Sequence, residues 1–291
     1  MGSPSRFNRL RSKAAPLLRP MFERIAPIRW MAVRLLGLRQ PSEVMLDENR
    51  FEVAPGDFGV TLELHATGGY EEGTRRFCLE YLREGMTFVD IGAHVGLYSV
   101  PAAKRVGATG RVLAFEPDEV NRTMLEANLE RNGVSGVEVF PFGVCDRDGR
   151  LPFHRSGFNT GDHQLFHSGR GRASSEIEVV RLDTIVDRLD AKVDLIKMDV
   201  QGAEAKVLAG MQELLSSGRA MAMIVELSPW MLRDIGDDPF ELLEGLVAHG
   251  FELGTIDEAS GHIESGDAGE ILARCVDSSY LNVRCLRGSR S

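Results

Sequence analysis

The fold is decided by the stretch Thr87-Phe88-Val89-Asp90-Ile91-Gly92-Ala93-His94-Val95-Gly96-Leu97-Tyr98. A β-branched and aromatic run reaches Asp90, and glycines follow at Gly92 and Gly96, where a strand would pass into a helix. Gly92 lets the backbone bend and approach a ligand without a Cβ, and Gly96 allows the helix to pack close to its strand. The stretch therefore predicts a nucleotide-binding turn, with a glycine turn that serves packing alone as the alternative.

Asp90 indicates which kind of ligand this turn binds. A phosphate site uses backbone N–H groups and a helix N-terminus, and a carboxylate at its mouth would repel the ligand. Asp90 instead suits a cationic or hydroxyl-rich ligand. S-adenosylmethionine fits that description because it carries an ammonium, a sulfonium and a ribose.

Two further acids are expected at the same edge of the predicted sheet. Gly110 to Glu116 is typical of a second strand ending in an acid, and Glu116 stands where the ribose hydroxyls of a bound nucleotide would lie. A third strand is predicted over 137–142. Asp146, in the loop after it, is a candidate acceptor for an adenine amino group, and a plain turn aspartate is the alternative.

A later strand, Val193 to Asp199, ends in a charged tip beside the first strand. Lys197 and Asp199 are two positions apart and point to the same side if the strand persists. With Glu204, at the start of the next helix, they form a candidate catalytic or substrate-orienting set. The alternative is a structural salt bridge between Lys197 and Glu204.

The segments before the first core strand are expected to cover the pocket. Alternation over 44–64, with turn residues at 55–57, predicts a small β-hairpin. A helix is predicted over 71–84 and would lie across the pocket mouth. Residues Tyr70 to Glu72 would contact cofactor or substrate there, unless they form a solvated helix start.

Residues 151–178 interrupt the alternation of strands and helices with a Gly-, Ser-, His- and Arg-rich connection that is expected to be functional or disordered. His154, His163 and His167 lie in it. Each is a candidate general base, and a solvent-exposed loop histidine is the alternative. We select His163 as the catalytic candidate.

The rest of the chain predicts a strand over 221–227, with Glu226 at the carboxyl edge, and a helix over 239–249. Strands are expected over 251–256 and 280–286. Only a turn-rich loop joins these last two, so antiparallel pairing is predicted.

The charge and cysteine content of the chain restrict the classes of function that it can have. The formal charge is −9, but residues 1–40 hold nine Lys or Arg and one acid, so the body of the chain is strongly acidic. An acidic body argues against a nucleic-acid substrate. Residues 1–40 also lack an uncharged run long enough to span a membrane, so they are expected to form a flexible arm, with weak contact to a membrane surface as the alternative. Four scattered cysteines predict a reducing, cytoplasmic setting and no metal site.

The chain resembles the FkbM family of class I S-adenosylmethionine-dependent methyltransferases over about residues 68 to 286. The resemblance depends on Val-Asp-Ile-Gly-Ala-His-Val-Gly at 89–96, Ala-Phe-Glu-Pro-Asp at 114–118, Asn128 with Asn132-Gly133, the 146–149 turn, Arg-Leu-Asp-Thr at 181–184, Ile-Lys-Met-Asp-Val-Gln-Gly-Ala-Glu at 196–204 and Val-Glu-Leu at 225–227. Two positions depart from the family pattern, which usually has asparagine at His94 and glutamate at Gln201.

The resemblance implies a Rossmann-like α/β fold with a doubly wound, mostly parallel seven-stranded sheet and an antiparallel last strand. It implies that S-adenosylmethionine is held by Asp90, Gly92 and Glu116, with His94, Gly96 and Asp146 as further cofactor candidates. Methyl transfer to a hydroxyl of a sugar, glycolipid or secondary metabolite is the implied reaction. Such a reaction needs a general base, for which Asp199 and His163 are candidates, while Lys197 and Glu204 orient each other or the acceptor.

The expected organisation is a basic arm over 1–43, a methyltransferase domain over 44–286 with its core at 86–286, and a loose tail over 287–291. Two other functions are weighed against methyl transfer. A nicotinamide-dependent dehydrogenase predicts Gly-x-Gly-x-x-Gly, which the Gly92 to Gly96 turn does not match. A binding module that kept the fold and lost the chemistry is supported only by His94 and Gln201. The sequence leaves the oligomeric state open.

Overall fold

The computed structural model of the protein describes residues 41–55, 57, 59–156, 159–165, 173–275 and 280–288. Residues 1–40, which contain nearly all of the basic arm, lie outside the described residues, as does His167. Among the described residues, no helix combines the length and the apolar composition needed to cross a bilayer.

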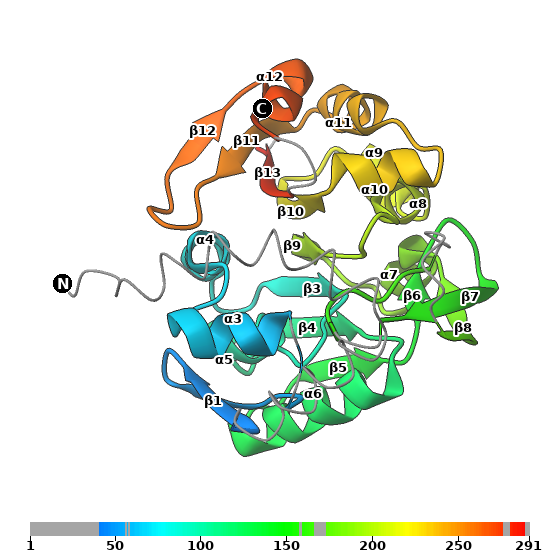
Figure 1. The fold of residues 1–291 in the computed structure, drawn as a ribbon. Helices are drawn as coiled ribbons and strands as arrows, with labels where there is room; N and C mark the ends of the chain where they lie inside the picture. The colour runs from blue at the N-terminus through cyan, green and yellow to red at the C-terminus, as the bar shows by residue number, and fades with distance from the viewer. Residues whose placement is uncertain are drawn as a thin grey trace, which may run out of the picture.

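A mixed sheet forms the centre of the molecule, in the strand order β12-β11-β13-β10-β9-β3-β4-β5 (Figure 1). Its strands are β3 (Thr87–Ile91), β4 (Arg111–Phe115), β5 (Val137–Phe140), β9 (Val193–Met198), β10 (Met221–Leu227), β11 (Glu252–Ile256), β12 (Ile263–Ser265) and β13 (Leu281–Arg287). The strands from β10 to β5 are parallel to one another, and β13 is antiparallel to both β10 and β11. The expected α/β fold is confirmed, and the short edge strand β12 adds an eighth member to the sheet.

Helices cover both faces of this sheet, and alternate residues of its strands pack against them. Val89 and Ile91 of β3 belong to the cluster that contains Leu182 and Val207, whereas Phe88 packs with Val106 on the opposite face. Burial on both faces explains the continuous apolar runs of the central strands. The ten helices of the described residues are α3 (Val60–Thr67), α4 (Glu72–Tyr81), α5 (Ser99–Val106), α6 (Glu119–Arg131), α7 (Leu182–Arg188), α8 (Glu204–Ala209), α9 (Gln212–Ser216), α10 (Pro229–Asp234), α11 (Pro239–Ala248) and α12 (Ala268–Arg274).

The N-terminal hairpin is present, but it is shorter than expected. β1 (Glu43–Leu46) pairs with β2 (Asn49–Glu52), and the turn lies at Asp47, whose φ of 52° is tolerated by aspartate. The expected turn at 55–57 instead leads into helix α3, because the Asp57 carboxylate accepts the Thr61 N–H at 2.8 Å. The prediction that alternation continues through residue 64 was therefore wrong.

The long connection after β5 contains a second sheet, which the sequence analysis missed. β6 (Gly143–Val144), β7 (Gly149–Arg155) and β8 (Ala173–Val180) form three strands in the order β6-β8-β7, and β7 and β8 project from one side of the molecule (Figure 1). Phe153 and Ile177 pack in a small cluster of their own. The alternation of apolar and polar residues in β7 and β8 is short and lies among polar residues. The polar composition of the segment therefore concealed the strands.

A smaller difference concerns the end of the last strand. The strand β13 includes Arg287, whose buried guanidinium donates to the carbonyls of Leu215, Arg219 and His249, so the chain is still ordered where a loose tail was expected to begin.

Candidate active site

The site lies at the carboxyl ends of β3 and β9, where the strand order of the sheet reverses. The glycine turn after β3 packs directly against the tip of β9. Gly92 has φ 81°, and a Cβ there would collide with the Asp199 carbonyl oxygen. Gly96 has φ 89°, and a Cβ there would meet Leu125 of α6. Both positions therefore require glycine for close packing.

Asp90 lies near the end of β3 with only 2% of its surface exposed. Its Oδ2 accepts a hydrogen bond of 2.6 Å from the Ser99 hydroxyl at the start of α5. Burial raises the pKa of Asp90 to about 6, although Ser99 and Lys197 partly offset the effect. A buried carboxylate of this kind gains from a cationic ligand, which would favour its ionised form.

Glu116 follows β4, and within the described residues only backbone N–H groups hold its carboxylate. Its Oε2 accepts the His94 N–H and its Oε1 accepts the Asp118 N–H, each at 2.8 Å. Burial raises the pKa of Glu116 to about 8 despite these two donors. The carboxylate is therefore fixed in place, and each oxygen keeps a second lone pair for a ligand hydroxyl.

His94 has φ 50° and fastens a loop to the glycine turn. Its Nε2 lies 2.8 Å from the Thr160 hydroxyl, while Nδ1 is buried without a hydrogen-bond partner in the described part of the chain. Asp57 and Asn121 bond to the backbone of Thr160 as well, through its N–H at 2.7 Å and its carbonyl at 3.1 Å. Burial lowers the pKa of His94. The ring therefore stays neutral near pH 7 and helps to hold residues 159–165 over the pocket.

Lys197, in β9, is buried between carboxylates. Its Nζ lies 3.4 Å from Asp199 Oδ2 and 4.0 Å from Glu71 Oε2, and 5.2 Å from the centre of the Tyr98 ring. Burial would lower the pKa of Lys197, but Asp199 and Glu71, with further acids, raise it well above its usual value. Within the described residues Lys197 forms no ion pair with Glu204, so that alternative was wrong.

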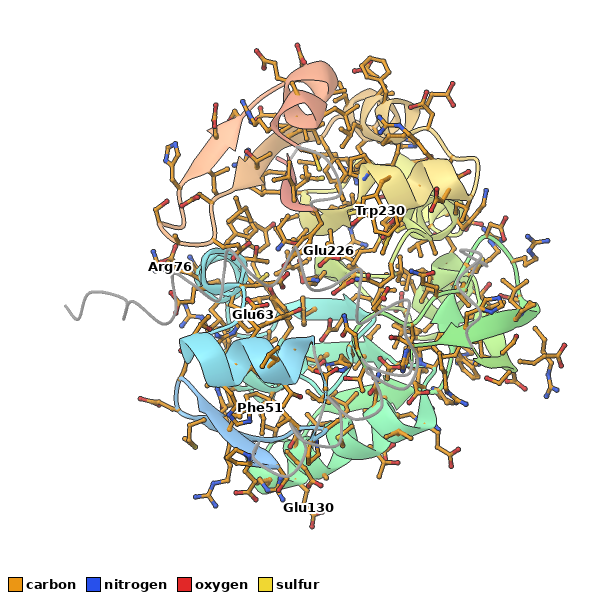
Figure 2. The ribbon with its side chains drawn as sticks, in the orientation of Figure 1. Phe51, Glu63, Arg76, Glu130, Glu226 and Trp230 are labelled. Atoms are coloured by element: carbon orange, nitrogen blue, oxygen red, sulfur yellow. The ribbon has the colours of Figure 1, made fainter. Side chains whose placement is uncertain are left out.

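Gln201 bridges the carboxylates of Asp199 and Glu226. Its side-chain Nε2 donates to Asp199 Oδ1 at 2.7 Å and to Glu226 Oε1 at 2.9 Å. Glu226, at the end of β10, lies near the centre of the molecule (Figure 2) and is 6% exposed. Burial and the neighbouring Asp199 raise the pKa of Glu226 well above its usual value.

Glu71 completes the cluster from the other end of the chain. It has φ 43° immediately before α4, its Oε2 accepts the Tyr98 hydroxyl at 2.6 Å, and its Oε1 accepts Asn282 Nδ2 at 3.0 Å. Burial raises the pKa of Glu71, and Lys197 opposes that shift. The segment before β3 thus contacts the site, although the helix that follows Glu71 ends at Tyr81, three residues earlier than expected.

One pocket of about 860 Å³, measured with its open mouth, collects most of the predicted site residues. The candidates that line it are Asp90, Gly92, His94, Glu116, His163, Lys197 and Asp199. Tyr70, Tyr98 and Gln201 line it as well, and no sequence pattern had selected Tyr98 or given Gln201 a role.

Three predicted residues do not line this pocket. Gly96 packs against α6. Asp146 forms an ion pair with Arg147 at 2.9 Å. Glu204 is buried beneath the pocket, where burial raises its pKa to about 7 and its Oε1 accepts the Gly202 N–H at 3.0 Å. Glu204 therefore supports the turn after β9.

His163 lies in the pocket wall with one ring nitrogen already engaged. Its Nδ1 accepts the Ser156 N–H at 3.1 Å, and its Nε2 lies 3.9 Å from Asp118 Oδ2. An Nδ1 that accepts a hydrogen bond fixes the proton on Nε2 in the neutral ring. This geometry leaves the ring no free basic nitrogen, so it favours Asp199 over His163 as the base.

The residues present fit S-adenosylmethionine. The pocket presents carboxylates and carries Lys197 as its one buried ammonium among the described lining residues, so it favours a cation over an anion. Glu116 is held as a hydroxyl acceptor, and the side chains of Phe142, Val144 and Leu165 supply apolar wall. The buried, unpartnered His94 Nδ1 is a further polar atom that a ligand would satisfy.

Comparison with known proteins agrees with this class of site. The model of the methyltransferase FkbM domain matches residues 90–253. The 31-O-demethyl-FK506 methyltransferase FkbM of Streptomyces tacrolimicus is 31% identical over 203 residues, which cover 59% of this chain and 75% of that protein. Methyltransferase sdnD of Sordaria araneosa is 29% identical over 43% of this chain and 60% of its own length, and the 2-O-methyltransferase NoeI of Sinorhizobium fredii is 32% identical over 38% and 51%.

The matches to sdnD and NoeI thus span less than two thirds of those proteins. Among solved structures, a putative rRNA-methylase from Clostridium thermocellum aligns with a TM-score of 0.47 and 12% identity, over 75% of this chain and 95% of that one.

Fold, pocket and family model together define a class I methyltransferase. The chain belongs to the FkbM family of S-adenosylmethionine-dependent methyltransferases. S-adenosylmethionine is its cofactor.

Proposed function

We propose that the protein methylates a hydroxyl group of a sugar or secondary metabolite, with Asp199 as the general base. The observation that carries this proposal is the fixed carboxylate of Asp199, which lines the same pocket as Asp90 and Glu116. Lys197 lies beside one of its oxygens and Gln201 binds the other. A base held on both sides is suited to proton transfer at a defined position.

The cofactor-binding roles belong to the acids at the first two strand ends. We assign Asp90 to the cationic amino-acid end of S-adenosylmethionine and Glu116 to its ribose hydroxyls. Gly92 keeps the turn open beside them, and His94 holds the loop at Thr160 across the pocket. Gly96 and Glu204 support the two turns from outside the pocket, and we do not assign Asp146 a contact.

Bound S-adenosylmethionine supplies an electrophilic methyl group on its sulfonium. The chain's own task is to align an acceptor oxygen with that methyl and to exclude water. Asp199 would take the proton that the hydroxyl loses as its oxygen bonds to the methyl carbon, while the bond from that carbon to sulfur would break and S-adenosylhomocysteine would leave. Lys197 stabilises the Asp199 carboxylate before this step and orients it.

The names of three relatives agree with an oxygen acceptor. One acts on 31-O-demethyl-FK506, one is a 2-O-methyltransferase, and the hexuronic acid methyltransferase AglP of Haloferax volcanii is 27% identical over 50% of this chain. We propose a small-molecule or carbohydrate acceptor on the strength of these names and of the acidic pocket. The same acidity disfavours nucleic acid. We also propose that residues 44–286 form the methyltransferase domain, with residues 86–286 as its core.

The test is label transfer from methyl-labelled S-adenosylmethionine into pooled cell extract, with products identified by mass spectrometry. We expect a methyl ether that survives mild base, which would cleave a methyl ester. A protein that binds S-adenosylhomocysteine but transfers no label would be the binding module instead. Binding of NADH in place of S-adenosylhomocysteine would indicate the dehydrogenase.

A further inference from the structure

Gln201 has one atom that the protein does not use. The side-chain nitrogen is committed to Asp199 and Glu226, whose carboxylates accept hydrogen bonds, so the orientation of the amide is fixed. The carbonyl oxygen, Oε1, has no hydrogen-bond partner within the described part of the chain. Because Gln201 lines the pocket, this oxygen is a free acceptor at the reaction site.

The backbone at Gln201 is held in an unusual conformation to place this group. Gln201 has φ 51° and Gly202 has φ 99°, and Gly202 is anchored by Glu204 at 3.0 Å. A non-glycine residue in the left-handed region costs free energy and persists only where its surroundings fix it. The hydrogen bonds from Gln201 to the Asp199 and Glu226 carboxylates, together with the contact between Gly202 and Glu204, provide that constraint.

Oε1 and Nε2 belong to one amide, so the free oxygen lies close to the Asp199 carboxylate that Nε2 contacts. The two groups therefore present adjacent hydrogen-bond acceptors to the pocket. A molecule that is to be methylated satisfies both of these protein oxygens only if it has two neighbouring hydrogen-bond donors. One donor is on the atom to be methylated and the other is beside it.

We infer that Gln201 is a specificity-determining residue, whose carbonyl oxygen binds a donor adjacent to the methylated hydroxyl, and that the acceptor is a 1,2-diol or a 1,2-amino alcohol. This inference rests on the proposed methyl transfer. It also gives the departure at Gln201 a function, because a glutamate here would bring a third carboxylate against Asp199 and Glu226, whereas the amide binds both without charge.

Periodate oxidation tests the acceptor class, because it cleaves 1,2-diols and 1,2-amino alcohols. One half of a pooled extract is oxidised, quenched and reduced, and the other half receives periodate that was quenched beforehand. Both then receive the full chain and methyl-labelled S-adenosylmethionine. We expect label in methyl ethers to fall at least about tenfold in the oxidised half. Undiminished label would overturn the inference while leaving the proposed function intact, and no label in either half would overturn both.

A third portion is N-acetylated and then oxidised with periodate, because an N-acetylated 1,2-amino alcohol resists cleavage whereas a 1,2-diol does not. Label that survives this treatment would identify the amino alcohol as the donor pair, since its amide N–H remains a donor, and lost label would identify the diol.

Variants of Gln201 test the role of the residue. Gln201→Met keeps the approximate size and loses both hydrogen-bonding functions, so we expect label transfer at limiting extract to fall roughly 10-fold while affinity for S-adenosylhomocysteine changes less than about twofold. Gln212→Met is the matched control, since the side chain of Gln212, on α9, donates only to the Leu208 carbonyl of α8 among the described residues. Equal activity of the Gln201 and Gln212 variants would contradict the assignment.

Gln201→Glu provides a readout that a merely structural role would not move. Protonated glutamate can replace the amide as a donor to Asp199, whereas ionised glutamate repels it. The ratio of variant to wild-type activity is therefore expected to rise as the pH falls from 8 to 6. A ratio independent of pH would argue against the bridge between Asp199 and Glu226.

Discussion

The proposed cofactor half of the pocket, which contains Asp90 and Glu116, and the proposed acceptor half, which contains Asp199 and Gln201, are built in different ways. In the cofactor half, Glu116 is bound by the backbone N–H groups of His94 and Asp118, and Asp90 by Ser99 only nine residues away. In the acceptor half, side chains bind other side chains that come from distant parts of the chain, such as Glu71 with Asn282. The cofactor half is therefore set by the turns after two strands, whereas the acceptor half depends on how α4, β9, β10 and β13 pack together.

This difference suggests which half tolerates change. Backbone donors stay in place when a side chain is replaced, so the cofactor half should lose affinity without losing its shape. Side-chain networks with buried charges leave unpaired groups when one member is removed. The acceptor half should therefore couple activity to stability more strongly.

The largest expected effect is on stability at Lys197. Lys197→Met leaves the buried Glu71 and the partly buried Asp199 without their cation, so we expect the free energy of unfolding to fall by about 3 kcal/mol. Chemical denaturation measures it. Lys206→Met is the control, because Lys206 pairs with Asp237 at the surface, 31% exposed, and should lose less than about 1 kcal/mol. Similar losses in both variants would remove the contrast between buried and surface pairs.

Asp199→Asn is expected to separate turnover from cofactor binding. It removes the proposed base but keeps the size of the side chain, so turnover should fall roughly 10²-fold or more. Affinity for S-adenosylhomocysteine should stay within about threefold. Steady-state label transfer and calorimetry provide the two numbers, and equal losses in both would mean that Asp199 is structural.

The cofactor half should show its own pH dependence. Glu116 has a pKa of about 8, above its ordinary value, so the folded protein without cofactor holds a proton there until the pH passes 8. A ligand that prefers the ionised carboxylate must displace that proton, and S-adenosylhomocysteine should bind roughly tenfold more tightly at pH 8 than at pH 6.5.

Titrations in two buffers of different ionisation enthalpy would count the released proton. Glu116→Gln should remove both the proton release and the pH dependence. A flat affinity profile for the wild type would contradict the role given to Glu116. The same raised pKa makes the protein without cofactor less stable as the pH rises from about 4.5 to 8, because the folded state binds the proton more tightly than the unfolded state.

The smallest effect is expected at His94. His94→Asn loses one neutral hydrogen bond to Thr160 but keeps the backbone N–H that binds Glu116, so affinity for S-adenosylhomocysteine should change no more than about fivefold. A loss of 100-fold would show that the imidazole contacts the cofactor. Calorimetry at pH 7.5, with Thr160→Val as the partner variant, measures it.

The sequence allowed Asp90 and Glu116 to be placed at one edge of the sheet because these acids stand at the ends of apolar strands, and their contact with the cofactor stays a prediction. Asp90 and Glu116 needed only the strand ends and the parallel order of the sheet, and the structure brings both into one pocket. Lys197 and Asp199 were found in the same way. What could not be predicted was their pairing, since Lys197 pairs with Glu71, 126 positions earlier in the chain, and not with Glu204.

The remaining errors share a physical cause. In the sequence, Gln201 could be interpreted only as a replacement for the family's usual glutamate. Its two partners, Asp199 and Glu226, become neighbours only when β9 and β10 lie side by side. The β7–β8 hairpin was hidden by polar composition, although every second residue is apolar and faces the same cluster in each strand, at Leu151 and Phe153 of β7 and at Ile177 and Val179 of β8. Predictions succeeded where local chemistry determined the structure and failed where long-range packing did.

The most direct test of the account is calorimetric titration of S-adenosylhomocysteine into the wild type and into Asp90→Ala, Glu116→Ala and Gln212→Met. The account predicts one binding site per chain, affinity lowered at least about tenfold in each of the two acid variants, and no change in the Gln212 control. Binding of unchanged affinity in Asp90→Ala and Glu116→Ala would contradict it, because the cofactor would then lie somewhere other than between these two carboxylates.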